Sequence, residues 1–148
     1  MGRFLRPFTL AALLATTALS AAAHSAQAQT TQPVRIGVLA DEAGFASDIG
    51  GAGAVLATRM AVEDLGGTVL GRPVEVLSAD MQNKPDVASN IVRSWFDREG
   101  VDMVTDIPVS SVALAVQAVA REKKKVLMIS AATTTELTNA QCSPYSIH

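Results

Sequence analysis

The chain has 148 residues, of which 49% are hydrophobic and 18% are charged, and its formal net charge is −2. This length permits one domain with a hydrophobic core of its own. The nearly balanced charge lacks the basic excess that nucleic-acid binding requires, so no nucleic-acid partner is expected.

The first 28 residues predict a cleaved signal peptide. Arg3 and Arg6 give it a positive start, residues 9–23 are apolar, and the AQA sequence at 26–28 matches a cleavage site. The apolar stretch is shorter than the roughly 20 residues that a membrane-spanning helix needs, which favours cleavage over retention as an anchor. We therefore expect an exported, periplasmic protein whose remaining residues carry ten basic and fourteen acidic side chains.

Strands and helices then alternate along the chain. Residues 34–40 are mostly apolar, which predicts a strand buried on both faces, and residues 41–49 predict a loop. Residues 50–65 have helical spacing. The glycines at 66–67 end this helix, because glycine tolerates the left-handed conformation of a helix C-cap. A second strand is expected at 73–80.

The next helix begins at Pro85, because proline is tolerated in the first turn. Its apolar stripe includes Ile91 and Trp95, which predicts that the tryptophan packs in the core. Gly100 ends this helix, and a third strand is expected at 101–105.

The last helix is expected to be capped by Ser110 or Ser111 and to end in the lysines at 123–125. A fourth strand follows at 126–129, and residues 133–136 have the capping-box spacing that begins a short helical turn. This order of elements predicts an α/β domain with a doubly wound parallel sheet.

In an open parallel sheet, ligands bind where loops follow the carboxyl ends of the strands. Three such loops are expected at 41–50, 106–111 and 130–135. The second leads into a helix N-terminus, whose free N–H groups and dipole favour an anion such as a carboxylate. The alternative is that Ser110, Ser111 and the threonines only cap their helices. The absence of bulky side chains from all three loops favours a ligand site.

Other chemistry has weaker support in the sequence. Gly51 and Gly53 follow the first strand and Asp80 ends the second, as in a dinucleotide-binding fingerprint, but the loop is too long and Leu56 replaces the third glycine. His148 is the one histidine outside the expected signal peptide, and no Ser-His-Asp arrangement can be assembled. We therefore expect no enzyme, no metal and no cofactor.

The single cysteine, Cys142, leaves two interpretations open. In an exported chain it is either a buried free thiol or its disulfide partner lies outside this sequence.

Four stretches carry a resemblance to a known family. They are IGVL at 36–39 followed by DIGG at 48–51, AVEDLGG at 61–67, Asp80 through PDVA at 85–88, and ISAATTTELT at 129–138. In this order and spacing they resemble the periplasmic substrate-binding proteins of ABC transporters, specifically the branched-chain amino-acid (Leu/Ile/Val) binding type. The likeness covers residues 34–148.

The resemblance implies the extracytoplasmic solute-binding component of an ABC importer, with a permease as its partner. It implies that loops hold the ligand's α-carboxylate and α-amino groups and that a side chain of the first loop covers the ligand. The positions that match are Asp48, Ile49, Val109, Ser110, Ser111, Ala131, Ala132 and Thr133. Val109 stands where many amino-acid binders have a hydroxyl residue. The sequence of residues 106–109 is more similar to that of family members that bind aromatic or other organic acids. An amino acid or a related small organic acid is therefore the implied ligand.

The resemblance also implies a type I fold of two lobes that closes on its ligand like a hinge. Residues 29–148 would form an incomplete first lobe, without the second lobe, because a fifth strand begins within residues 142–148. The alternative function is a ligand-sensing domain of a receptor or regulatory system with the same fold; a receptor would continue into a transmembrane helix beyond residue 148.

Overall fold

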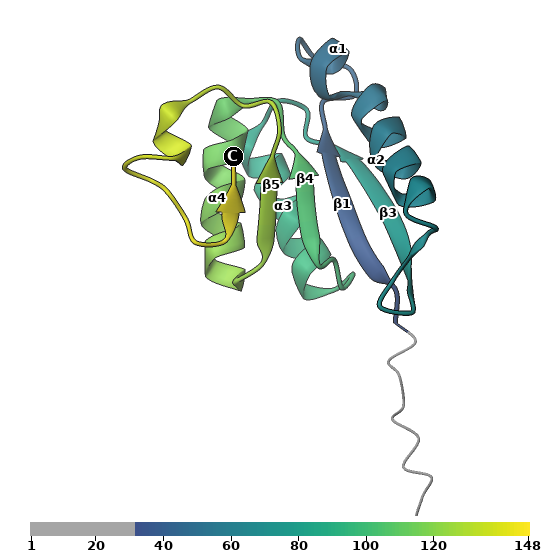
Figure 1. The fold of residues 1–148 in the computed structure, drawn as a ribbon. Helices are drawn as coiled ribbons and strands as arrows, with labels where there is room; N and C mark the ends of the chain where they lie inside the picture. The colour runs from purple at the N-terminus through teal and green to yellow at the C-terminus, as the bar shows by residue number, and fades with distance from the viewer. Residues whose placement is uncertain (1–31) are drawn as a thin grey trace, which may run out of the picture. The chain divides into compact units, whose positions relative to one another are not determined.

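The computed structural model describes residues 32–148, and the expected signal peptide with its cleavage site lies outside the described residues. Six strands form one sheet in the order β2-β3-β1-β4-β5-β6 (Figure 1). Their bounds are β1 Val34–Ala40, β2 Thr68–Val69, β3 Arg72–Asp80, β4 Met103–Asp106, β5 Val126–Ile129 and β6 Ser146–Ile147. Neighbouring strands are parallel except β2 and β3, which are antiparallel. The predicted bounds of β1 and β5 are confirmed.

Strand β2 was not expected from the sequence. It pairs with the start of β3 across the two-residue turn formed by Leu70 and Gly71, which have φ values of 51° and 75°. Two positive φ values in a two-residue turn are typical of a type I′ hairpin. A strand of two residues is too short to produce a periodic pattern, which is why the sequence did not reveal it.

Four α-helices and one 3-10 helix connect the strands. They are α1 Ser47–Gly50, α2 Ala52–Asp64, α3 Pro85–Asp97, α4 Ser110–Lys123 and the 3-10 helix η1 Thr135–Leu137. The prediction of a loop throughout 41–49 is wrong, because α1 occupies the end of that segment. None of the helices within residues 32–148 is both long and apolar enough to cross a membrane.

Helices cover both faces of the sheet, as the doubly wound prediction requires. Because successive strand residues point to opposite faces, Val38 and Leu39 of β1 lie on different sides. Val38 packs with Val55 of α2 in a small cluster. Leu39 belongs to the larger cluster, which α3 and α4 cover.

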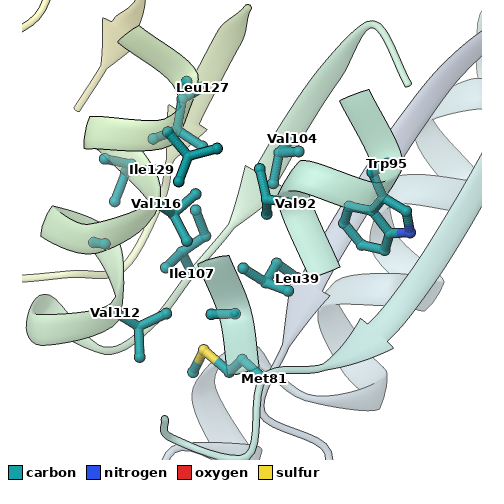
Figure 2. Close-up of a cluster of buried hydrophobic side chains, with 14 of the residues drawn as sticks. Leu39, Met81, Val92, Trp95, Val104, Ile107, Val112, Val116, Leu127 and Ile129 are labelled. Carbon is teal, nitrogen blue, oxygen red and sulfur yellow. The ribbon is translucent and has the colours of Figure 1, made fainter. Parts of the chain in front are cut away.

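The larger cluster is the main core (Figure 2). Its fully buried side chains include Val92 of α3 and Val116 of α4, and each such side chain contributes about 1.5–3 kcal/mol relative to an exposed one. Trp95 is 4% exposed, which confirms its predicted place in the core. A Cβ added at Gly37 of β1 would lie 2.5 Å from its ring, so only glycine permits this approach.

One half of the sheet face that carries α2 remains open. Helix α2 packs against β1 and β3, whereas β4, β5 and β6 continue this face without a helix among the described residues (Figure 1). On β5 and β6 the exposed fractions are 43% for Val126, 41% for Met128 and 59% for Ile147. The buried residues of β5, Leu127 and Ile129, point to the opposite face and pack in the main core.

Cys142 is exposed, so the interpretation of a buried free thiol is wrong. Its backbone N–H donates to Asn139 O within the segment between η1 and β6.

Candidate functional site

The sheet has a point at which the strand order reverses. From β1 the chain crosses to β3 on one side, and it then returns to β4 on the other side and continues to β5. Ligands of doubly wound sheets bind outside the carboxyl ends of the strands at this switch point. The relevant loops are those that follow β1, β4 and β5.

A buried carboxylate shapes the loop after β1. Asp41 has no exposed surface, and its side chain accepts hydrogen bonds from Gly44 N at 2.9 Å and Ala46 N at 2.8 Å. Asn83 Nδ2, in the loop after β3, donates to the same carboxylate at 2.9 Å. These bonds fold the loop into a tight turn that leads into α1, and this is why part of the expected loop is helical.

The predicted site residues of the first loop therefore lie on α1. Asp48 and Ile49 are both exposed, and Ile49 has 71% of its surface accessible. Gly50 ends α1 and contacts the next loop, because a Cβ at Gly50 would lie 2.6 Å from Pro108 Cγ. The structure thus brings the loops after β1 and β4 together.

The loop after β4 turns sharply into α4. Asp106 and Ile107 have φ values of 82° and 62°, in the left-handed region that few residues other than glycine adopt. Val109 is then extended and occupies the N-cap position without a side-chain cap, and Ser110 is the first helical residue. The prediction that Ser110 or Ser111 caps this helix is therefore wrong. A serine one or two residues inside the helix lacks the extended backbone that side-chain capping needs.

Ser110 instead connects two of the loops. Its Oγ accepts a hydrogen bond from Thr133 N at 3.2 Å. Thr134, and not Thr133, caps η1, since Thr134 Oγ1 accepts from Glu136 N at 3.4 Å. The short helical turn is confirmed, but the predicted capping box is wrong, because with Thr134 as the N-cap the third helical residue is Leu137 and not Glu136. The Thr133 residue is exposed.

The remaining predicted residues flank these contacts. Val109 and Ala131 are half-buried, Ser111 is exposed, and Ala132 is buried. The carbonyl oxygen of Ala132 accepts a hydrogen bond from His148 Nε2 at 2.6 Å. All eight predicted residues thus lie on α1, at the start of α4 or in the loop after β5, at the carboxyl edge of the sheet.

This edge offers hydrogen-bond donors for a negatively charged group. The first backbone N–H groups of α4 have no side-chain cap, and the helix dipole makes this end attractive to an anion. Ser111 and Thr133, next to or within the Ser110 contact, are exposed hydroxyl residues. Within residues 32–148, no group of His, Cys, Asp and Glu side chains has the arrangement of a metal site.

Asp106, like Asp41, is a residue of this site that the sequence analysis missed. It is 4% exposed, and Ser130 Oγ donates to its Oδ1 at 3.1 Å, while Oδ2 is buried without a hydrogen-bond partner. Burial raises the pKa of the Asp106 carboxyl, and the Ser130 hydrogen bond only partly offsets this effect. The sequence did contain a signal for Asp106, because this acidic residue directly follows the strand expected at 101–105, at the switch point of the sheet.

Comparisons with known proteins agree with this fold. A family model described as a periplasmic binding protein matches residues 33–148. Among solved structures, a periplasmic binding protein from Burkholderia mallei is 45% identical, with a TM-score of 0.75, over 78% of this chain and 31% of its own. A branched-chain amino-acid ABC transporter periplasmic ligand-binding protein from Burkholderia xenovorans is 43% identical, with the same TM-score and coverage.

A more distant neighbour shares the fold. A solute-binding protein of an ABC transporter from Rhodopseudomonas palustris, in complex with benzoate, is 23% identical, with a TM-score of 0.70, over 78% of this chain and 32% of its own. The chain thus spans about a third of the length of these structures. No curated protein matches its sequence. The family match and the two Burkholderia structures confirm the resemblance inferred from the sequence, and the chain belongs to the periplasmic binding protein family.

Proposed function

We propose that this chain is part of the extracytoplasmic solute-binding component of an ABC importer and that it captures an amino acid or a small organic acid, including aromatic acids. The uncapped start of α4 beside the Ser110–Thr133 contact carries the proposal. A carboxylate is the group that both ligand classes share, and backbone N–H groups at a helix N-terminus bind it without a charged side chain.

The proposed contacts use residues from two loops. The ligand carboxylate accepts hydrogen bonds from the first N–H groups of α4 and from the hydroxyl groups of Ser111 and Thr133. Val109 and Ala131 provide the apolar surroundings, which strengthen these bonds by excluding water. Asp48 and Ile49 on α1 cover the ligand from the side.

The partner and the compartment belong to the same proposal. The family implies the periplasm, and the sequence of residues 1–28 supports export by a cleaved signal peptide. We place an ABC transporter permease as the partner that receives the ligand. The names of the Burkholderia xenovorans and Rhodopseudomonas palustris proteins, both of ABC transporters, support this choice.

We further propose that residues 29–148 form the incomplete first lobe of a two-lobe protein. Two observations support this: the solved relatives are about three times as long as the matched region, and the open half of the sheet exposes Val126, Met128 and Ile147. Doubly wound sheets are normally covered on both faces, so a further segment of the protein is expected to pack there.

A thermal-shift experiment tests the ligand class. L-leucine, L-isoleucine and benzoate are compared with their carboxamides, with ionic strength held constant. A ligand that binds only the folded state stabilises it by about 2.7 kcal/mol at one hundred times its dissociation constant. We expect at least one carboxylate to raise the melting temperature and its carboxamide to have little effect. Equal effects of acid and amide, or no effect of any acid at concentrations of tens of millimolar, would contradict the proposal.

A further inference from the structure

We propose that Asp106 is a positioning residue that holds the three loops of the binding site together in its neutral carboxylic-acid form, and that loss of its proton weakens ligand binding. The effect on ligand binding rests on the proposed function, but the contacts of Asp106 with the loops do not depend on which ligand binds.

The Asp106 side chain lies where the three loops meet. Its Oδ1 accepts a hydrogen bond from Ser130 Oγ at 3.1 Å, and its backbone oxygen accepts one from Ser130 N at the same distance. These contacts join the loops after β4 and β5. On the other side, a Cβ at Gly50 would lie 2.8 Å from Asp106 Oδ2, so this oxygen packs directly against the end of α1.

The backbone at this point explains why the side chain matters. Asp106 and its neighbour Ile107 both adopt a left-handed φ, an unfavourable conformation that persists only when surrounding contacts hold it. This turn sets the direction in which the chain enters α4. Contacts of the Asp106 carboxyl therefore fix the position of the backbone N–H groups that would bind the ligand.

Within residues 32–148, no cation pairs with Asp106. The two residues that contact its side chain, Gly50 and Ser130, are uncharged, and none of the ion pairs in the described part of the chain includes it. Other charged groups of the neighbouring elements are engaged elsewhere or exposed. They include Asp41, bound to its own loop, and the exposed side chains of Asp48, Glu42 and Glu136, while His148 is bound to Ala132 O.

Ionisation would place a negative charge on Oδ2, which is buried without a donor. The cost of burying an unpaired charge favours either the neutral acid or movement of the side chain toward water. The Ser130 hydrogen bond itself favours the charged form, so the contact at risk is that of Oδ2 with Gly50, and its loss would release the strained turn. Desolvation, the main cause of the raised pKa of Asp106, acts in the same direction.

Two substitutions separate the neutral form from the charged form. Asp106→Asn is permanently neutral, retains an oxygen that can accept from Ser130, and tolerates a left-handed φ. Asp106→Gly relieves the backbone strain but removes the side chain. We expect Asp106→Asn to bind benzoate or L-isoleucine as tightly as the wild type or more tightly at pH 7.5. Asp106→Gly should fold but bind the same probe about tenfold more weakly.

A measurement without ligand makes the test independent of the proposed function. The ¹³C signal of the Asp106 carboxyl and the amide signals of Gly50, Ser110 and Thr133 are followed by NMR as the pH is raised. We expect all four signals to titrate together in the wild type and the three amide signals to lose this titration in Asp106→Asn. Amide signals that ignore the Asp106 titration would overturn the inference. Binding by Asp106→Asn that is tenfold weaker would also overturn it, because the charged form would then be the active one.

Discussion

Two adjacent threonines in the loop after β5, Thr133 and Thr134, have different structural roles. Thr134 caps η1 through its hydroxyl, whereas the exposed Thr133 contributes its backbone N–H to the contact with Ser110. We expect Thr134→Ala to lower the free energy of unfolding by about 0.5–1 kcal/mol, and Thr133→Ala to change it by less than about 0.5 kcal/mol. Urea denaturation of the two variants measures both changes in the free energy of unfolding.

Ligand binding should respond in the opposite order. Thr133→Ala removes a proposed donor to the carboxylate and should weaken binding, while Thr134→Ala should leave it nearly unchanged. If Thr134→Ala weakened binding and Thr133→Ala did not, the assignment of Thr133 to the site would be wrong.

Asp106 also makes stability depend on pH. Because burial raises the pKa of its carboxyl, the folded chain keeps a proton at pH values where the unfolded chain has lost it. Its contribution to the free energy of unfolding is full below the ordinary pKa of 3.8 and is lost as the pH rises through the raised value.

Urea denaturation over a pH series checks this sign. Asp106→Asn should remove the loss of stability between pH 3.8 and the raised pKa of Asp106. Ser130→Ala should extend the window to higher pH, because the Ser130 hydrogen bond lowers the pKa. A wild-type curve that parallels the Asp106→Asn curve throughout would show that Asp106 titrates normally.

At the scale of the elements, two glycines provide a matched pair. A Cβ at Gly37 of β1 would lie 2.5 Å from the Trp95 ring, whereas a Cβ at Gly53 of α2 would meet nothing within 4 Å. We expect Gly37→Ala to destabilise the fold by about 1–3 kcal/mol through overpacking. Gly53→Ala should stabilise it by about 0.5–1 kcal/mol through helix propensity. Thermal unfolding of the two variants distinguishes them, and equal effects would contradict the packing of Trp95 on β1.

The sequence predicted those elements whose patterns are local and long enough to read. The bounds of β1 and β5 were correct because both strands are mostly apolar and are flanked by polar residues or turns. Pro85 correctly marked the start of α3. The N-terminal residue of α4 depended on the extended backbone of Val109, which the hydroxyl residues around it do not reveal. For the same reason the capping prediction failed at Ser110 and Ser111.

The candidate site was predicted in part. The resemblance identified the loops after β4 and β5, and the structure joins them through Ser110 and Thr133. Asp41 and Asp106 were missed as structural parts of the site because an acid after a strand usually indicates a solvated loop. Their burial depends on residues far away in the sequence, such as Asn83 and Ser130.

At the scale of the whole molecule, the open half of the sheet has consequences for solubility. Contiguous exposed apolar side chains favour association with other surfaces. We expect residues 29–148 alone to self-associate as concentration rises, measured by sedimentation velocity. The double substitution Val126→Thr and Met128→Thr should reduce this association, whereas Leu65→Thr, at the exposed end of α2 and outside the open strands, should not. A wild-type chain that stays monomeric at millimolar concentration would remove this support for a missing covering segment.

The proposed function depends on carboxylate binding at the start of α4. The most direct measurement is a ¹⁵N NMR titration of residues 29–148 with benzoate and L-isoleucine, with benzamide and L-isoleucinamide as controls. We expect at least one acid to shift the amide signals of Ser110, Ser111 and Thr133 in a saturable manner, and its amide to leave them unchanged. Saturable shifts confined to other parts of the chain, or no difference between acid and amide, would contradict it.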